Sequence, residues 1–159
     1  MSRLLDMAGP RWRRVRGDAE AGNAIVEFVY LAVLLMVPLV YVLLTVFRVQ
    51  SAAYAASSAA REAGRVFATS ESVDGAGGRA FAAARIVMGD SDLPLAASDL
   101  RITCSSTPCL QPGSRVEVVV AYDVSLPLLP RFLDGRAPAT VEVTSRHVEV
   151  VDRYREAAR

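Results

Sequence analysis

A run of 20 uncharged residues, 28–47, constrains this chain more than any other feature. Fourteen of the 20 are Leu, Val or Phe, and Pro38 stands near the middle. At about 1.5 Å per residue, a helix of this length spans about 30 Å, which is the thickness of a bilayer's hydrocarbon core. The run therefore predicts a membrane-spanning helix over about 25–47, in which the proline is tolerated and produces at most a kink.

The charges that flank the apolar run predict its orientation. Arg48 follows the run alone until Arg61, whereas several arginines precede it. Those arginines are Arg3, Arg11, Arg13, Arg14 and Arg16. Because positively charged flanks stay on the cytoplasmic side, we expect a cytoplasmic N-terminus and an extracytoplasmic chain after about residue 48. A cleaved secretory signal with the site Ala53-Tyr54-Ala55 is the alternative, although such signals usually have a shorter core of about 7–15 residues.

Composition excludes several classes of protein. The 159 residues leave room for one domain, and 52% hydrophobic residues with 22% charged argue against a disordered chain. A net charge of +1 argues against a nucleic-acid-binding surface. Two Cys and one His are too few for a four-ligand zinc site without carboxylates. His147 has no nucleophile motif nearby, so the sequence predicts no catalytic residue, no metal and no cofactor.

Glu27 is the unusual residue of the predicted helix, because it follows Ile25 and Val26 inside apolar sequence. A charged side chain at the centre of a bilayer costs about 2.5–3.5 kcal/mol on insertion scales, and less near an end. An acid in this position therefore calls for a partner. The plain alternative is a single-pass anchor in which the Glu27 carboxylate reaches back to the membrane interface.

Gly22 suggests what that partner is. The pattern Gly-x-x-x-x-Glu, at the start of a membrane helix and after a short Arg-rich leader, resembles a prepilin processing site. The resemblance implies that a membrane-embedded peptidase cuts between Gly22 and Asn23, which makes Glu27 the fifth residue of the mature chain. The new amine of Asn23 would then pair with a Glu27 carboxylate in the same or a neighbouring subunit, because an unpaired charge is costly at low dielectric.

The helix is expected to continue beyond the membrane. The stretch after Arg48 is rich in Ala, the best helix former, and contains no Pro up to Thr69. A helix over 23–69 would be about 70 Å long. Small residues recur in it with the i, i+3, i+4 spacing of one helix face, namely Ala52, Ala56, Ala59, Ala60 and Ala63. This face would pack closely against other subunits or against the chain's own C-terminal domain, and the sequence leaves both open.

Residues 70–159 predict a small α+β domain. Residues 70–78 have the composition of a loop, and 79–88 predict a short second helix that ends at Gly89. Apolar residues then alternate with polar ones, which predicts strands. The expected strands are 100–103, 116–126 and a third from Val141 onward. We expect an antiparallel sheet of about three strands that packs on the outer half of the long helix.

The last strand carries an irregularity. Val141 and Val143 stand at odd-numbered positions, whereas Val148 and Val150 stand at even-numbered ones. In a regular strand the two pairs would therefore face opposite sides. This change predicts a β-bulge near Ser145-Arg146, or the end of the strand there.

A Pro-rich connection separates the two longest predicted strands. Its apolar residues are Leu128, Leu129, Phe132 and Leu133. It has too many prolines for a strand interior and too much apolar surface for an ordinary loop. We expect these four side chains to cap the sheet, or alternatively to contact the membrane surface or a neighbouring subunit.

Cys104 and Cys109 are separated by four residues. Outside the cytoplasm a disulfide between them is permitted, and the loop-entropy model gives such a short ring about 2 kcal/mol. Its expected effect is to fix the turn before the strand that begins near Val116. A redox function is not expected, because redox pairs usually have Cys-x-x-Cys spacing.

The order of these features resembles the TadE-like pseudopilins, which are minor pilins of tight-adherence (Tad/Flp) pili. The resemblance is most specific over 22–30 and 116–150. It implies a cleaved basic leader over 1–22, a long helix over 23–69 and an extracytoplasmic domain over 70–159. It implies a structural function in the assembly, initiation or regulation of a surface pilus for adhesion or DNA uptake.

The same resemblance implies the partners. These are the prepilin peptidase, other minor pilins, the major pilin, the inner-membrane platform and the lipid bilayer, with no directly bound nucleic acid. An unprocessed membrane-anchored domain of another secretion or assembly machine is the second hypothesis. A secreted enzyme is the third, and the missing catalytic residues speak against it.

Overall fold

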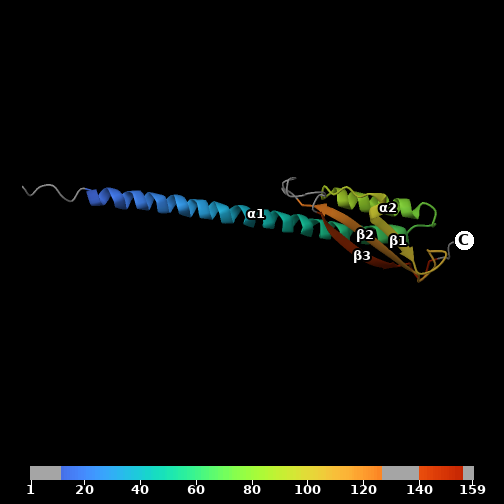
Figure 1. Ribbon diagram of the computed structural model, residues 1–159. Coiled ribbons are helices and arrows are strands. Elements are labelled where there is room, and N and C mark those ends of the chain that lie inside the picture. Colours follow the sequence, from blue (N-terminus) through green and yellow to red (C-terminus); the bar gives the residue numbers. More distant parts are fainter. Residues whose placement is uncertain (1–11, 127–139, 156–159) are drawn as a thin grey trace, which may run out of the picture. The chain divides into compact units, whose positions relative to one another are not determined.

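The computed structural model describes residues 12–126 and 140–155, with side chains described from Asn23 onward (Figure 1). The elements are α1 (Trp12–Ala68), α2 (Ala76–Gly89), a short 3-10 helix η1 (Ala97–Asp99), β1 (Leu100–Cys104), β2 (Arg115–Ser125) and β3 (Thr140–Val150). A long apolar helix, a second helix and a three-stranded antiparallel sheet confirm the predicted α+β layout. The chain divides into two compact units, with the boundary between Leu43 and Leu44.

Helix α1 has 57 residues and includes Pro38. It begins at Trp12, within the predicted leader, and ends one residue before the predicted Thr69. Its last carbonyl groups, which have no partner within the helix, accept hydrogen bonds from the backbone of the residues that follow and from side chains. The Thr69 hydroxyl donates to the Arg65 carbonyl at 2.8 Å. The Arg155 guanidinium, which lies far from this end of α1 in the sequence, donates to the carbonyls of Ala68 and Ser70.

The sheet has the order β1-β2-β3 with antiparallel pairing throughout. Leu100 pairs with Val120, and Val118 pairs with His147. Alternate side chains of β2 are fully buried, as the two-residue period predicted. The buried set is Val116, Val118, Val120 and Val124.

One hydrophobic core joins the outer part of α1 to α2 and to the inner face of the sheet. The predicted small-residue face of α1 is completely buried in it, at Ala52, Ala56, Ala59, Ala60 and Ala63. Helix α2 contributes residues at four-residue spacing, Ala76, Ala80, Ala84 and Met88. Since these alanines pack against the chain's own domain, they are not a surface left for other subunits.

The predicted bulge in the last strand is wrong. The pairing of β3 with β2 runs without a break from Thr140–Ser125 to Val150–Arg115. Val148 and Val150 therefore lie on the outer face, where each is about half exposed, and His147 lies on the inner face beside α1. Gly64 of α1 lies against this face, and a Cβ there would be 3.3 Å from Cδ2 of His147.

Helix α2 begins earlier than the predicted residue 79. Gly75 precedes it with a φ of 73°, in the left-handed region that glycine tolerates. Ala76 is fully buried and fixes the first turn, so the glycines that suggested a loop lie inside the helix. The helix ends at the predicted Gly89. The predicted interface residues Leu128, Leu129, Phe132 and Leu133 lie outside the described residues.

Candidate functional site

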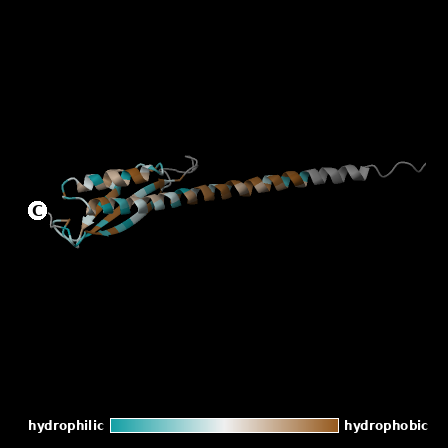
Figure 2. Cartoon of the chain, turned by 180° about the vertical axis from the view of Figure 1, so that it is seen from behind, coloured by the Kyte–Doolittle hydropathy of each residue, from teal (hydrophilic) through white to brown (hydrophobic). Residues whose placement is uncertain are grey.

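Among the residues that the structure describes, α1 is the helix long and apolar enough to cross a membrane. The large apolar side chains from Ile25 to Phe47 are between 45% and 72% exposed, and Figure 2 shows this apolar stretch of the helix. Apolar surface on every side of a helix is unstable in water, and hydrocarbon is the solvent that suits it. Helix α1 is therefore a candidate membrane span, as the sequence predicted.

The predicted processing residues lie at one end of this stretch, on consecutive turns of α1. Asn23 and Glu27 are both exposed. Because they are four residues apart, they share one helix face, with an axial separation of about 6 Å. Among the described residues, the Glu27 carboxylate has no hydrogen-bond or ion-pair partner. Asn23 therefore lies one helical turn from an exposed acid.

The bond between Gly22 and Asn23 lies inside α1, which extends upstream to Trp12. A peptidase can cut this bond only if the helix opens locally. Glycine favours such opening, since it costs about 1 kcal/mol relative to alanine in a helix interior.

Cys104 and Cys109 form a disulfide, with their Sγ atoms 2.16 Å apart. The turn that follows is tied to the strands by two serine hydroxyls. Ser114 Oγ donates to the Cys109 carbonyl at 2.7 Å, and Ser105 Oγ accepts from the Arg115 N–H at 2.9 Å. The disulfide thus closes the turn before β2, as predicted.

Replacement of both cysteines by serine should lower the free energy of unfolding of the C-terminal unit by about 2 kcal/mol, because the unfolded chain regains loop entropy. The melting temperature should fall by several degrees. Thermal melting of the full chain in detergent, followed by circular dichroism, measures this effect. Added reductant should reproduce the shift in the wild type and cause none in the double variant; an unchanged melting temperature would mean that the ring adds nothing.

Charged side chains near the junction of α1 and β3 form local pairs. Arg65 and Glu62 make a salt bridge of 2.6 Å, and the hydrogen bond from Arg65 lowers the pKa of Glu62. His147 Nε2 lies 3.1 Å from Glu149 Oε2. The sequence analysis missed the second pair, although two residues at spacing two in a strand share a face. Both pairs lie at the helix–sheet junction.

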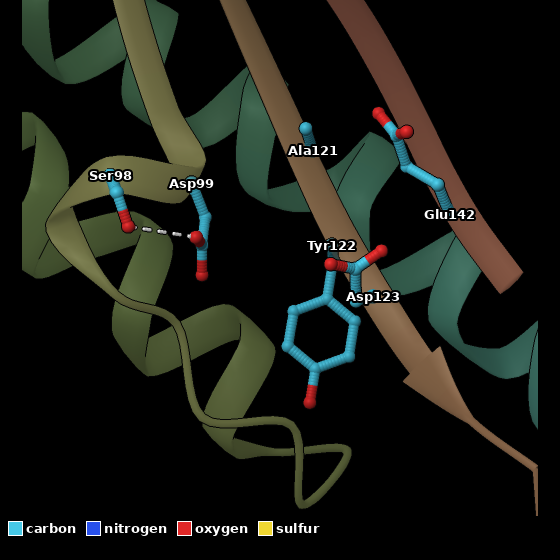
Figure 3. Close-up of a pocket in the computed structure, with 6 residues that line it drawn as sticks. All are labelled: Ser98, Asp99, Ala121, Tyr122, Asp123 and Glu142. Atoms are coloured by element: carbon cyan, nitrogen blue, oxygen red, sulfur yellow. Dashed lines mark hydrogen bonds between the residues drawn. The ribbon is translucent and has the colours of Figure 1, made fainter. Parts of the chain in front are cut away.

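A depression of about 340 Å³ lies at the ends of β2 and β3 (Figure 3). It is lined by Ser98, Asp99, Ala121, Tyr122, Asp123 and Glu142. The Asp99 carboxylate is already engaged, because it accepts from Ser98 Oγ at 3.0 Å and from the Ala96 N–H at 2.9 Å. Residues 23–126 and 140–155 contain no group of three or more His, Cys, Asp or Glu side chains placed to hold a metal.

Comparisons with protein-family models, curated proteins and solved structures give no match to this chain. The functional conclusion therefore depends on the geometry of α1 and on the sequence around Gly22.

Proposed function

We propose that this chain is a minor pilin or pseudopilin of the TadE-like kind, a structural subunit of a Tad/Flp-type pilus. The observation that carries the proposal is the position of Glu27. It is the only acid in the apolar part of α1, it follows Gly22 by five residues, and it has no partner among the described residues. A charge in this place is costly unless another group satisfies it.

The layout of the rest of the chain supports this function. The apolar part of α1 is a candidate membrane span. The Ala-rich part of the same helix packs with a small antiparallel sheet in one core. The Cys104–Cys109 disulfide suits an oxidising compartment, which agrees with a C-terminal unit outside the cytoplasm. In this arrangement the Arg-rich N-terminus stays in the cytoplasm.

The proposed mechanism is assembly by charge pairing. Prepilin peptidase removes residues 1–22, and the Asn23 amine becomes a cation near the inner end of the span. That amine pairs with the Glu27 carboxylate of its own or a neighbouring subunit, and the pairing fixes the register between subunits. Other minor pilins, the major pilin and the inner-membrane platform are the partners in this process, and the filament serves adhesion or DNA uptake.

A second candidate is an unprocessed single-pass anchor for another secretion or assembly machine. The specific observation in its favour is that α1 runs unbroken through Gly22 to Trp12. In that case Glu27 reaches back to the membrane interface and needs no amine.

The N-terminus of the protein from its native membrane separates these candidates. N-terminal sequencing and intact mass should give a chain that starts at Asn23. A Gly22→Leu variant should keep its leader, whereas Gly17→Leu, the same change at another leader glycine, should be cut normally. A wild-type chain that starts at Met1 would refute processing, and a start just after Ala55 would indicate a cleaved secretory signal.

A further inference from the structure

Just beyond the candidate membrane span, α1 has one covered side and one uncovered side. The covered side carries the alanine face, whose five side chains are completely buried in the chain's own core. At about 100° per residue, Phe47 and Tyr54 lie within about 20° of each other and nearly opposite the alanine face. Their side chains are 65% and 76% exposed. The chain's own described elements therefore leave both aromatic rings largely uncovered.

The uncovered side becomes more polar with distance from the span. We define it by Phe47, Ser51, Tyr54, Ser58 and Arg61, which are all exposed and fall within a sector of about 80°. Along it an apolar ring is followed by an aromatic ring with a hydroxyl group, and then by a guanidinium. Tyrosine is enriched where hydrocarbon gives way to lipid headgroups, because its ring is apolar and its hydroxyl is polar. The order of these side chains is therefore the order of layers at the edge of a bilayer.

The depth of Tyr54 matches the headgroup layer. The run 28–47 has the length of the hydrocarbon core, so Phe47 marks the edge of that core. A bilayer is about 40–45 Å thick with its headgroups and about 30 Å without them, which leaves a layer of about 5–8 Å on each side. The Cα atom of Tyr54 is about 10 Å beyond that of Phe47, and a helical side chain leans back over the preceding turn. The phenol ring of Tyr54 therefore falls within the headgroup layer.

We propose that the uncovered side of α1 is a lipid contact, at which the ring of Tyr54 lies among the headgroups at the C-terminal end of the span. Phe47 contacts hydrocarbon, and Arg61 stays in water. Because the opposite side of the same turns is packed in the core, this contact sets the height at which the C-terminal unit stands above the bilayer. It depends on the membrane span but not on cleavage after Gly22 or on filament assembly, so it holds for a processed subunit and for an unprocessed anchor.

Tryptophan fluorescence of the full chain in phosphatidylcholine vesicles tests the contact. Trp12→Phe first removes the only tryptophan of the sequence. In that background Tyr54→Trp places a reporter at the expected headgroup level, and Leu35→Trp places one at an exposed position in the middle of the span. The vesicles contain lipid with a nitroxide quencher either on the headgroup or deep in the acyl chain. At position 54 the headgroup label should quench about twofold more strongly than the acyl-chain label, and at position 35 the order should be reversed.

Tyr154→Trp is the matched control, because it makes the same aromatic change at a position that is 97% exposed. Tyr154 is next to Arg155, which binds the Ala68 carbonyl at the far end of α1. Ala68 is about 21 Å further from the span than Tyr54. Neither label should therefore quench the tryptophan at position 154.

Three results would overturn the proposal. Headgroup quenching at position 54 that is as weak as at position 154 would refute the lipid contact and leave the span intact. Protection of position 54 from the label that disappears when the chain is diluted with more lipid would mean that a second copy covers Tyr54. Absence of acyl-chain quenching at position 35 would refute the span, and with it this contact.

Discussion

A Glu27→Ala variant should be processed like the wild type and should nevertheless be nearly absent from assembled filaments. Processing is retained because the scissile bond after Gly22 is unchanged. Assembly fails because the Asn23 amine then enters the membrane region without a counter-charge. A cost of about 1.4 kcal/mol reduces an equilibrium tenfold, and an unpaired charge in the bilayer costs up to about 2.5–3.5 kcal/mol. We therefore expect at least a tenfold loss.

The measurement is the amount of this chain in the sheared surface fraction, relative to the amount in the membrane. Glu20→Ala is the matched control, because cleavage removes residue 20 and the mature subunit is identical to the wild type. Glu27→Asp keeps the charge on a shorter side chain and should restore part of the assembly. Filament levels that stay normal in Glu27→Ala would contradict charge pairing, even if processing itself is confirmed.

Enlargement of the alanine face of α1 should have the largest effect on stability. Ala59 is completely buried where α1, α2 and the sheet share one core. Ala59→Leu adds three carbon atoms to a closely packed interior, and such overpacking costs about 1–3 kcal/mol. That is a large part of the 5–15 kcal/mol that typically stabilises a domain. The strand signal of the full chain in detergent should therefore melt at a markedly lower temperature.

Ala53→Leu is the control for this substitution. It makes the same change in the same helix, one and a half turns away, at an exposed position. Since leucine is nearly as good a helix former as alanine, the melting temperature should stay close to that of the wild type. If Ala53→Leu destabilised the domain as strongly as Ala59→Leu, the alanine face would not be the packing surface.

The elements with a strict period could be predicted from the sequence. The apolar run predicted the apolar part of α1, and the two-residue alternation predicted β2 with its buried valines, because each pattern depends only on local geometry. The prediction from composition was wrong at the start of α2, because Gly77 and Gly78 suggested a loop and lie inside the helix. Burial of the neighbouring Ala76 in the core outweighs the low helix propensity of these glycines.

The spacing of the candidate processing residues follows from local geometry alone. Gly22 and Asn23 are adjacent and Glu27 is one turn further along the same helix, so their spacing is fixed as soon as that helix exists. The disulfide could also be predicted from the sequence, since Cys104 and Cys109 flank one short turn. The pairing of Glu27 with the Asn23 amine stays a prediction, because that amine would exist only after cleavage.

The sequence by itself determined the apolar span, the acid within it and the strand periods, since helices and strands impose these patterns on near neighbours. Only the tertiary structure decided which partner the alanine face meets and which way β3 faces. The unbroken pairing of β3 with β2 places His147 on the inner face, close to Gly64 of α1, and leaves Val148 outside. Residues 64 and 147 lie far apart along the chain, and the space that one leaves for the other exists only after helix and sheet have packed.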